Sequence, residues 1–181
     1  LTGGFPCQSF SIVAQNPKRL GVKDERGKLF FEMCRILKEK QPKCFIAENV
    51  KGILTANKKS AFPLILKEFE DSGYVQYRIL NSANYGVPQK RERVIIVGFR
   101  SDLNIKFDFP ENIINDESKF EPLEKVVEKS VDEKYFFSQR AVEGMLRRRE
   151  SMNKGRAQDL SKPCNTVGAH LAKVSLNSTD P

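Results

Sequence analysis

A short apolar run, Cys44-Phe45-Ile46-Ala47, constrains the fold of this 181-residue chain more than any other feature. Pro42 precedes it and separates it from a helical pattern upstream. A nearly continuous apolar run of this length is typical of a strand buried on both faces of a parallel sheet. The polar pair Glu48-Asn49 follows at its carboxyl end, where ligands collect in α/β sheets.

Apolar side chains recur at three- and four-residue spacing on both sides of this strand, which predicts amphipathic helices. The pattern predicts helices over 29–37 and 61–72, and strands over 44–47, 74–80 and 94–99. Gly73 is expected to end the second helix. Cys34 on the helix face and Cys44 in the core strand are expected to act as small hydrophobes. This order of elements predicts an α/β fold.

The composition changes after Arg100, where a polar stretch to Glu121 predicts a linker or an irregular excursion. A further helix is expected near Ser138. We therefore divide the chain into residues 1–110 and 111–181. Because the sequence starts without Met and ends in a polar turn, both ends are expected to be boundaries of a fragment.

Charge and cysteine content bound the class of protein. The formal charge of +8 fits a polyanionic partner or a solvated positive surface. No stretch reaches the roughly 18 apolar residues of a membrane span, so no membrane partner is expected. No pair of the four Cys has metal-ligand spacing, so no metal is expected. Without a secretory signal, this cysteine usage suggests a reducing cytosol.

Three places could carry chemistry. Cys7 lies on a loop constrained by glycines and Pro6, which suits either a nucleophile or a surface cysteine in a turn. Glu48 directly after a buried strand is unfavourable unless it is paired or used, although it could merely cap the next turn. In the segment leading into the third strand, Gln89, Arg91 and Arg93 alternate and would share one face, as on a solvated edge.

Together, these places resemble the cytosine-5 DNA methyltransferase family over nearly the whole chain. Pro6-Cys7-Gln8 matches the nucleophile loop of the family, Glu48-Asn49-Val50 its acidic motif, and Gln89-x-Arg91-x-Arg93 its arginine motif. The run 84–88 matches the stretch before those arginines, and Thr166-Val167 resembles a dipeptide of the target recognition region. The resemblance implies part of a Rossmann-like S-adenosylmethionine-dependent methyltransferase sheet over 1–110 and a partial target recognition domain over 111–181.

The resemblance also implies roles for these residues. Cys7 would add to carbon 6 of cytosine, Glu48 would supply a proton or strong hydrogen bond to N3, and Arg93 would bind the carbonyl oxygen at position 2. Arg91 is expected in the same site, and Arg91 and Gln89 would brace it. A cytosine must be flipped out of the duplex to reach a thiolate. The residues expected to contact substrate or DNA are Gln8, Ser11, Lys18, Arg19, Asn49, Gln89 and Thr166.

The cofactor implied is S-adenosyl-L-methionine, and only Pro6 and Leu29 align with family positions that touch it. The Gly-rich motif and the acidic ribose-binding residue of the family precede the nucleophile loop and are absent. We therefore expect poor cofactor binding and no turnover by this stretch alone, with the missing segments on the same chain or on a complementary subunit. The implied setting is a bacterial restriction-modification system, with a cytoplasmic, nucleoid-associated protein acting as a monomer on double-stranded DNA.

Three alternatives stay open at this point. A branch of the same family methylates cytosine in transfer RNA, although residues 5–10 look more like the bacterial DNA enzymes. A cysteine-dependent hydrolase would need a base, and His170 is the single imidazole. A non-catalytic DNA-binding fragment is the third, and the presence of Cys7, Glu48 and Arg93 argues against it.

Overall fold

The structure is a computed structural model that describes residues 1–5, 29–71, 73–140, 143 and 158–167. Its main elements are β1 (Thr2–Gly3), α1 (Leu29–Lys40), β2 (Cys44–Val50), α2 (Ala61–Glu70), β3 (Tyr74–Asn81) and β4 (Glu92–Phe99). Two 3-10 helices lie between them, η2 (Lys51–Lys59) and η3 (Ser82–Tyr85). The helices predicted over 29–37 and 61–72 and the three predicted strands are thus confirmed, with shifted ends.

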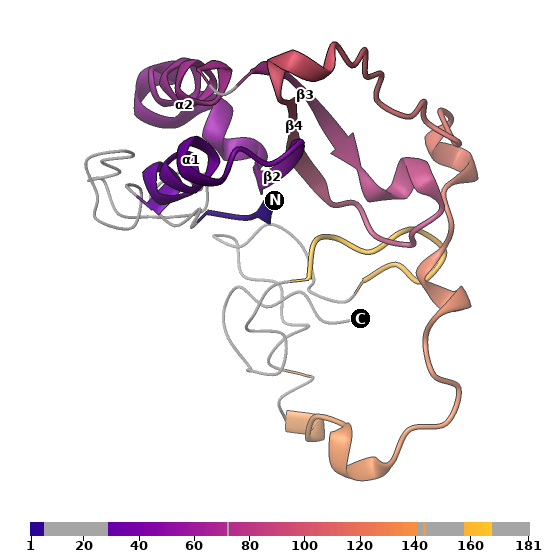
Figure 1. Cartoon of the computed structure of the whole chain (residues 1–181). Coiled ribbons are helices and arrows are strands. Elements are labelled where there is room, and N and C mark those ends of the chain that lie inside the picture. Colours follow the sequence, from indigo (N-terminus) through magenta and orange to yellow (C-terminus); the bar gives the residue numbers. More distant parts are fainter. Residues whose placement is uncertain (6–28, 72, 141–142, 144–157, 168–181) are drawn as a thin grey trace. The chain divides into compact units, whose positions relative to one another are not determined.

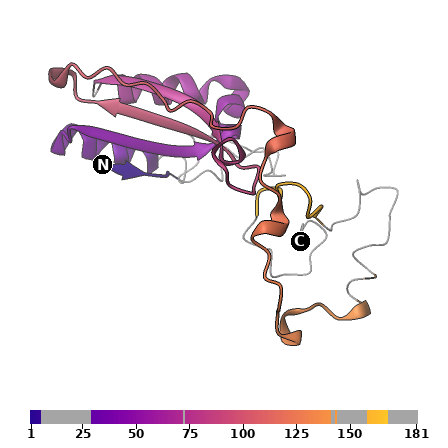
Figure 2. The same ribbon diagram turned by 90° about the vertical axis from the view of Figure 1, so that its right-hand side faces the viewer.

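The strands form one mixed sheet in the order β1-β2-β4-β3. β1 pairs with β2 in parallel, whereas β2 and β4 run antiparallel with Ala47 opposite Ile96. Figures 1 and 2 show α1 and α2 on the same side of this sheet. The sheet is therefore covered by helices on one side within the described part of the chain.

The core lies between the two helices and the sheet. Each helix contributes apolar side chains at helical spacing, and β2 and β4 contribute alternate residues. The fully buried members include Phe30, Ala47, Ile65, Phe69, Val94 and Ile96. Burying each of the large ones stabilises the fold by roughly 1.5–3 kcal/mol.

The helix ends follow the sequence signals. Gln41 takes a left-handed φ of 43° after α1, and its N–H donates to Leu37, which lets the chain turn before Pro42. Gly73 follows α2 with a φ of 140°, and a Cβ there would lie 2.2 Å from the Phe99 carbonyl oxygen. The prediction of a terminating glycine is therefore confirmed.

Two predictions about β2 are wrong. The strand continues through Val50, so Glu48 and Asn49 lie inside it instead of after its end. Its side chains alternate between buried and exposed: Cys44 is exposed, and Ile46 keeps 44% of its surface accessible. The apolar run was interpreted as burial on both faces, but β2 pairs antiparallel with β4 and packs through one face. Cys34, by contrast, is buried as predicted.

Contacts within the described chain separate two units. The first contains residues 1–80 and 92–111, and the second contains residues 81–91 and 112–181. The segment 81–91, which joins β3 to β4, thus associates with the later part of the chain. Most of the helix expected from Ser138 lies outside the described residues. No helix among the described residues is long and apolar enough to cross a membrane.

Candidate active site

Glu48 and Arg93 meet on the sheet face opposite α1 and α2. In the antiparallel register, Glu48 is opposite Ile95 and Val50 is opposite Arg93. Glu48 and Arg93 are therefore diagonal neighbours on one face, a separation that long side chains can bridge. The Nε atom of Arg93 lies 2.7 Å from Oε1 of Glu48. The pairing of β2 with β4 thus brings together two residues that are 45 positions apart.

Arg93 keeps a donor available although the pair is close. Its side chain is 18% exposed, against 45% for Glu48, and its Nη1 donates to the Glu92 carbonyl at 2.8 Å. The buried Nε–H has no hydrogen-bond acceptor among the described residues, because the contact with Glu48 has ion-pair distance without hydrogen-bond alignment. An unsatisfied buried donor is costly unless another group accepts from it. A guanidinium carries five N–H groups, so the exposed part of Arg93 can still donate to a substrate oxygen.

Asn49 points to the other face of the sheet and ties Phe5 to β2. Its side chain is only 1% exposed. Nδ2 donates to the Phe5 carbonyl at 3.4 Å, and Oδ1 accepts from the Val50 N–H at 2.9 Å. Sequence analysis placed Asn49 among residues that contact substrate or DNA. In the structure, both ends of its amide are instead engaged within the protein.

Phe5 anchors the same point of the chain through its ring. The ring is buried, with its centroid 5.8 Å from that of Phe30 and 6.4 Å from that of Phe69. Two residues earlier, Gly3 pairs with Ala47 in the parallel ladder of β1 and β2. The backbone leading to Pro6 and Cys7 is therefore held by the sheet, by the aromatic core and by Asn49.

Gly4 brings this backbone close to the Glu48 carboxylate. A Cβ at Gly4 would lie 3.5 Å from Glu48 Oε2 and 3.8 Å from the Glu48 carbonyl oxygen. Glu48 therefore lies over the chain three residues before Cys7. The arrangement places a carboxylate, a guanidinium and the approach to a cysteine within one part of the first unit.

Gln89 and Arg91 belong to the second unit, and their predicted strand alternation is wrong. β4 begins at Glu92, so neither residue lies in it. Gln89 instead forms an isolated parallel bridge with Cys164, and its Nε2 lies 3.8 Å from Cys164 Sγ. The Arg91 N–H donates to Asn81 Oδ1 at 3.1 Å. Irregular backbone therefore replaces the expected strand face.

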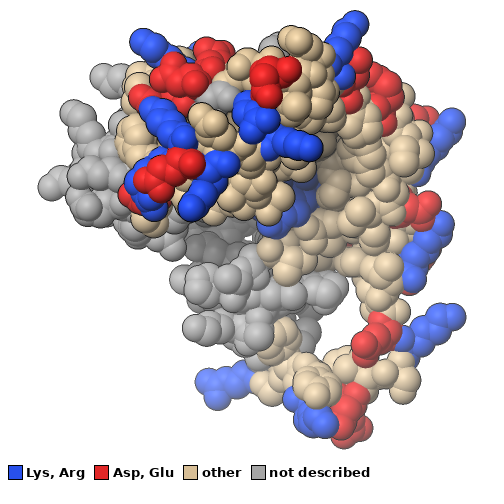
Figure 3. Space-filling model, viewed as in Figure 1, with Lys and Arg blue, Asp and Glu red and all other residues tan. Residues whose placement is uncertain are grey.

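The remaining predicted site residues divide into two groups. Leu29 is the first residue of α1 and is 47% exposed, and Thr166 donates its hydroxyl to the Lys90 carbonyl at 2.8 Å. Pro6, Cys7, Gln8, Ser11, Lys18 and Arg19 lie outside the described residues. In the view of Figure 3, basic and acidic side chains are interspersed over α1 and α2.

Sequence reasoning missed the residues that hold the backbone around Arg91. Asn81 caps η3 by accepting from the Ala83 N–H at 3.2 Å, and Ser82 Oγ donates to the Gln89 carbonyl at 2.6 Å. Asn84 Nδ2 donates to the Ile114 carbonyl at 2.7 Å. The signal was present in the run Asn81-Ser82-Ala83-Asn84, because such residues favour caps and turns.

Comparisons with known proteins agree over nearly the whole chain. The sequence model of the family described as C-5 cytosine-specific DNA methylase matches residues 1–174. The chain is 39% identical over 180 residues to the Type II methyltransferase M.BsuFI of Bacillus subtilis, covering 96% of this chain and 42% of that protein. It is 52% identical over 122 residues to M.FnuDI of Fusobacterium nucleatum, covering 66% of this chain and 35% of that protein. The chain thus spans less than half the length of these relatives.

A solved structure resembles the fold. The structure of a Spodoptera frugiperda DNMT2 mutant matches 99% of this chain and 51% of that chain, with a TM-score of 0.64 and 19% sequence identity. At that identity, the likeness concerns the fold alone. It confirms the α/β class that the order of helices and strands predicts and the Rossmann-like fold that the family resemblance implies.

Proposed function

Because this chain belongs to the family of C-5 cytosine-specific DNA methylases, we propose that its protein methylates carbon 5 of a flipped cytosine in a specific duplex DNA sequence, as part of a bacterial restriction-modification system. The observation that carries the proposal is the contact of Arg93 with Glu48 beside the backbone that leads to Cys7. In this proposal, residues 1–110 supply the catalytic part, and residues 111–181 supply part of the target recognition domain.

The reaction starts at Cys7. Its thiolate forms a bond between Sγ and carbon 6 of cytosine, and the electron pair of the C5–C6 double bond moves to carbon 5. After carbon 5 is methylated, its proton leaves to solvent base, the double bond returns, and the thiolate is expelled. The anchoring of Phe5 by Asn49 supports this role, because attack requires a nucleophile held in a defined position.

Glu48 and Arg93 assist the addition by stabilising charge on the ring. The Glu48 carboxyl gives a proton or a strong hydrogen bond to N3, and Arg93 donates to the oxygen at position 2 as negative charge develops there. The guanidinium of Arg93 supports this role, since it carries five N–H donors and contacts Glu48 through Nε and the Glu92 carbonyl through Nη1. A bound cytosine would thus receive hydrogen bonds from both residues.

S-adenosyl-L-methionine is the proposed cofactor, and it supplies the methyl group when bound. Among the described residues, Leu29 fits contact with it: the side chain lies at the start of α1 and leaves almost half of its surface for a ligand. Pro6 is the second proposed contact.

Duplex DNA is the proposed partner, with one protein copy serving one flipped base. Gln8, Ser11, Lys18 and Arg19 remain proposed DNA contacts on the strength of the sequence. Gln89 and Arg91 remain proposed to brace the site on the strength of the sequence. Bacterial genomic DNA as substrate places the proposed reaction in the cytoplasm, at the nucleoid.

A methyl-transfer assay on the purified full-length protein tests the function. Radiolabelled S-adenosylmethionine is offered with duplex DNA in one arm and with transfer RNA in the other, and Cys7→Ala serves as the control. We expect label on carbon 5 of cytosine in DNA that depends on Cys7. Label on transfer RNA alone, or transfer to DNA that survives Cys7→Ala, would contradict the proposal.

A further inference from the structure

We propose that residues 164–166 form a strap that fixes the backbone of Pro88–Arg91, and that Thr166 is thereby a positioning residue for the arginine motif. The inference rests on the proposed function and assigns Thr166 a different task from the DNA contact that the sequence suggested. All of the contacts that carry it lie within the second unit.

The strap pairs with Pro88–Arg91 like a short parallel strand. The Cys164 N–H donates to the Pro88 carbonyl at 3.0 Å, and the Lys90 N–H donates to the Cys164 carbonyl at 2.8 Å. Thr166 completes the row by donating its hydroxyl to the Lys90 carbonyl at 2.8 Å. Cys164 is buried in this arrangement, so the strap is seated by its side chain as well as by its backbone.

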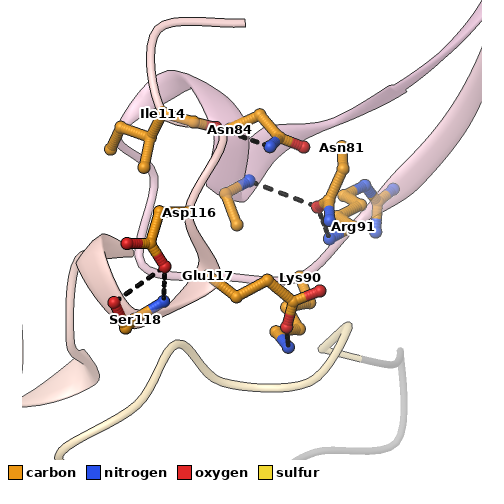
Figure 4. A network of polar contacts seen from close by, with 9 residues as sticks. Asn81, Asn84, Lys90, Arg91, Ile114, Asp116, Glu117 and Ser118 are labelled. Atoms are coloured by element: carbon orange, nitrogen blue, oxygen red, sulfur yellow. Dashed lines mark hydrogen bonds and ion pairs between the residues drawn. The ribbon is translucent and has the colours of Figure 1, made fainter.

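The opposite side of the same segment is held by Asn81 and Ser82. Asn81 Oδ1 accepts from the Arg91 N–H at 3.1 Å, a contact drawn in Figure 4. Ser82 Oγ donates to the Gln89 carbonyl at 2.6 Å, and the Ser82 N–H donates to the Arg91 carbonyl at 3.1 Å. Each carbonyl and N–H from Pro88 to Arg91 then has a partner, since the Gln89 N–H donates to Val87 at 2.7 Å.

Side-chain contacts of Lys90 reinforce the position. Its Nζ lies 2.6 Å from Glu117 Oε2, as Figure 4 shows, and 5.7 Å from the centroid of the Phe120 ring. The Asp116 side chain in turn caps the turn that carries Glu117 by accepting from the Ser118 N–H at 3.0 Å. Three separate stretches of sequence thus converge on the four residues before β4.

This complete pairing has a functional consequence. Pro88–Arg91 lies outside any helix or strand, so the direction of the Arg91 side chain is set by these contacts instead of by a regular ladder. Thr166 is more than 70 residues away in sequence and belongs to the stretch proposed to recognise DNA. The hydrogen bond from Thr166 to Lys90 would therefore fix the position of Arg91 as well. Arg93 follows Arg91 by two residues in the same motif.

Thr166→Val and Thr166→Ser in the full-length protein test the strap. Valine removes the hydroxyl and keeps the shape, whereas serine keeps the donor. Because small displacements of positioned groups are expensive in catalysis, we expect Thr166→Val to lower kcat by about three- to tenfold. The KM for duplex DNA and its salt dependence should stay within about twofold, and Thr166→Ser should restore kcat.

Two results would overturn the strap. One is an increase in the KM for DNA with a weaker salt dependence and an unchanged kcat, which is the signature of a lost phosphate contact. The other is no change in any of these quantities. A double-mutant cycle adds a second measurement: Ser82→Ala and Thr166→Val act on the same segment, so their effects on kcat should be non-additive.

Amide hydrogen exchange separates this inference from the proposed function. Peptides that contain Lys90 and Arg91 should exchange faster in Thr166→Val than in the wild type or in Thr166→Ser. If the wild-type protein methylates no DNA but this difference in exchange is seen, the proposed function is contradicted and the proposed role of the strap is supported. If DNA is methylated and exchange is equal in all three proteins, only the proposed role of the strap is contradicted.

Discussion

The Nε atom of Arg93 lies 2.7 Å from Oε1 of Glu48, and the two residues are diagonal neighbours on one face of β2 and β4. At the adjacent position in β4, Glu92 forms a second carboxylate contact, with Lys51 Nζ at 2.9 Å, but that pair is exposed. The structure therefore offers a candidate catalytic pair, Glu48 and Arg93, and a nearby ion pair of similar chemistry outside the site. The same substitution at Glu48 and at Glu92 can therefore be compared.

Glu48→Gln removes the proton donor while keeping the size of the side chain. Because general acid catalysis contributes about 10²–10⁴-fold to a rate, we predict a fall of that order in kcat. Steady-state methylation of duplex DNA by the full-length protein measures it. Glu92→Gln, which disrupts the exposed pair with Lys51, should leave kcat within about twofold because exposed ion pairs contribute little. Equal losses in both variants would refute a special role for Glu48.

Arg93→Lys keeps the positive charge but replaces the guanidinium, whose several donors can serve Glu48 and a substrate oxygen together. Removing one donor to a developing oxyanion lowers kcat by about 10²–10³-fold. We predict a loss of that size for methyl transfer, with thermal unfolding used to check that the variant folds. A folded Arg93→Lys protein with wild-type kcat would show that the guanidinium does not contact the reacting base.

Asn49→Ala should destabilise the fold and loosen the start of the nucleophile loop. The change leaves the Phe5 carbonyl and the Val50 N–H without their partner in a buried place. We predict a decrease of about 1–3 kcal/mol in the free energy of unfolding, measured by urea denaturation. Asn115→Ala removes an amide that accepts from Asn112 in an exposed position and should change stability by less than about 0.5 kcal/mol. Similar decreases in the free energy of unfolding for Asn49→Ala and Asn115→Ala would contradict the proposed role of Asn49 in anchoring Phe5.

Gly98 in β4 lies directly under the ring of Phe45, its partner in β2. A Cβ at Gly98 would come within 2.1 Å of Phe45 Cε1, so the ring would have to move in a packed core. We predict that Gly98→Ala lowers the free energy of unfolding by about 1–3 kcal/mol. In a Phe45→Ala background the same change should be much less harmful. Additive effects of the two changes would argue against this contact.

The sequence predicted the elements well because their signals are local. The apolar spacing over 29–37 and 61–72 marked α1 and α2, and Gly73 marked the end of α2. Burial of β2 could not be predicted from its apolar run, because Ile46 and Ala47 look alike in sequence while only Ala47 faces the helices. Which side chains of β2 are buried depends on the antiparallel pairing of β4 beside it, which is a property of the tertiary structure.

The candidate site shows the same division. The motifs identified Glu48 and Arg93, and the structure places them in contact. The same motif predicts that Gln89 and Arg91 continue the strand, but Asn81 and Ser82 bond to their backbone groups, and Cys164 bonds to the backbone of the neighbouring Pro88 and Lys90. The run 81–84 carries a local turn signal, whereas Cys164 lies 75 residues from Gln89 in sequence, so no local pattern could reveal its contacts. Asn49 is predicted to contact substrate or DNA, but its amide is buried and bonds to Phe5 and Val50, a contact that only the fold reveals.

Cys34 and Cys44 should differ sharply in reactivity. Burial raises the pKa of the Cys34 thiol from its ordinary 9.0 to about 11, while the Cys44 side chain is exposed. Because the thiolate is the reactive form, iodoacetamide at pH 8 should modify Cys44 and spare Cys34 in the folded protein. Mass spectrometry of the digested protein measures both. Equal modification under native conditions would contradict the burial of Cys34.

The raised pKa also gives a direction for stability. The folded protein holds the Cys34 proton more tightly than the unfolded chain does. The protonated Cys34 thiol therefore makes its whole contribution to the free energy of unfolding below pH 9.0, and this contribution is lost as the pH rises through about 11. The variant Cys34→Ala should show a shallower loss of stability over that range in urea denaturation. The same dependence of the free energy of unfolding on pH in Cys34→Ala and in the wild type would contradict a raised pKa of Cys34.

Covalent trapping tests the central claim most directly. Duplex DNA that contains 5-fluorocytosine at the target position cannot lose a proton from carbon 5, so an enzyme of the proposed mechanism stays bound to carbon 6 after methylation. With the full-length protein and S-adenosylmethionine, we predict a denaturation-resistant protein–DNA adduct whose mapped site is Cys7. It should form far more slowly with Glu48→Gln, and Cys7→Ala should abolish it. A folded wild-type protein that methylates ordinary duplex DNA but forms no such adduct, or forms it at another residue, would contradict the account.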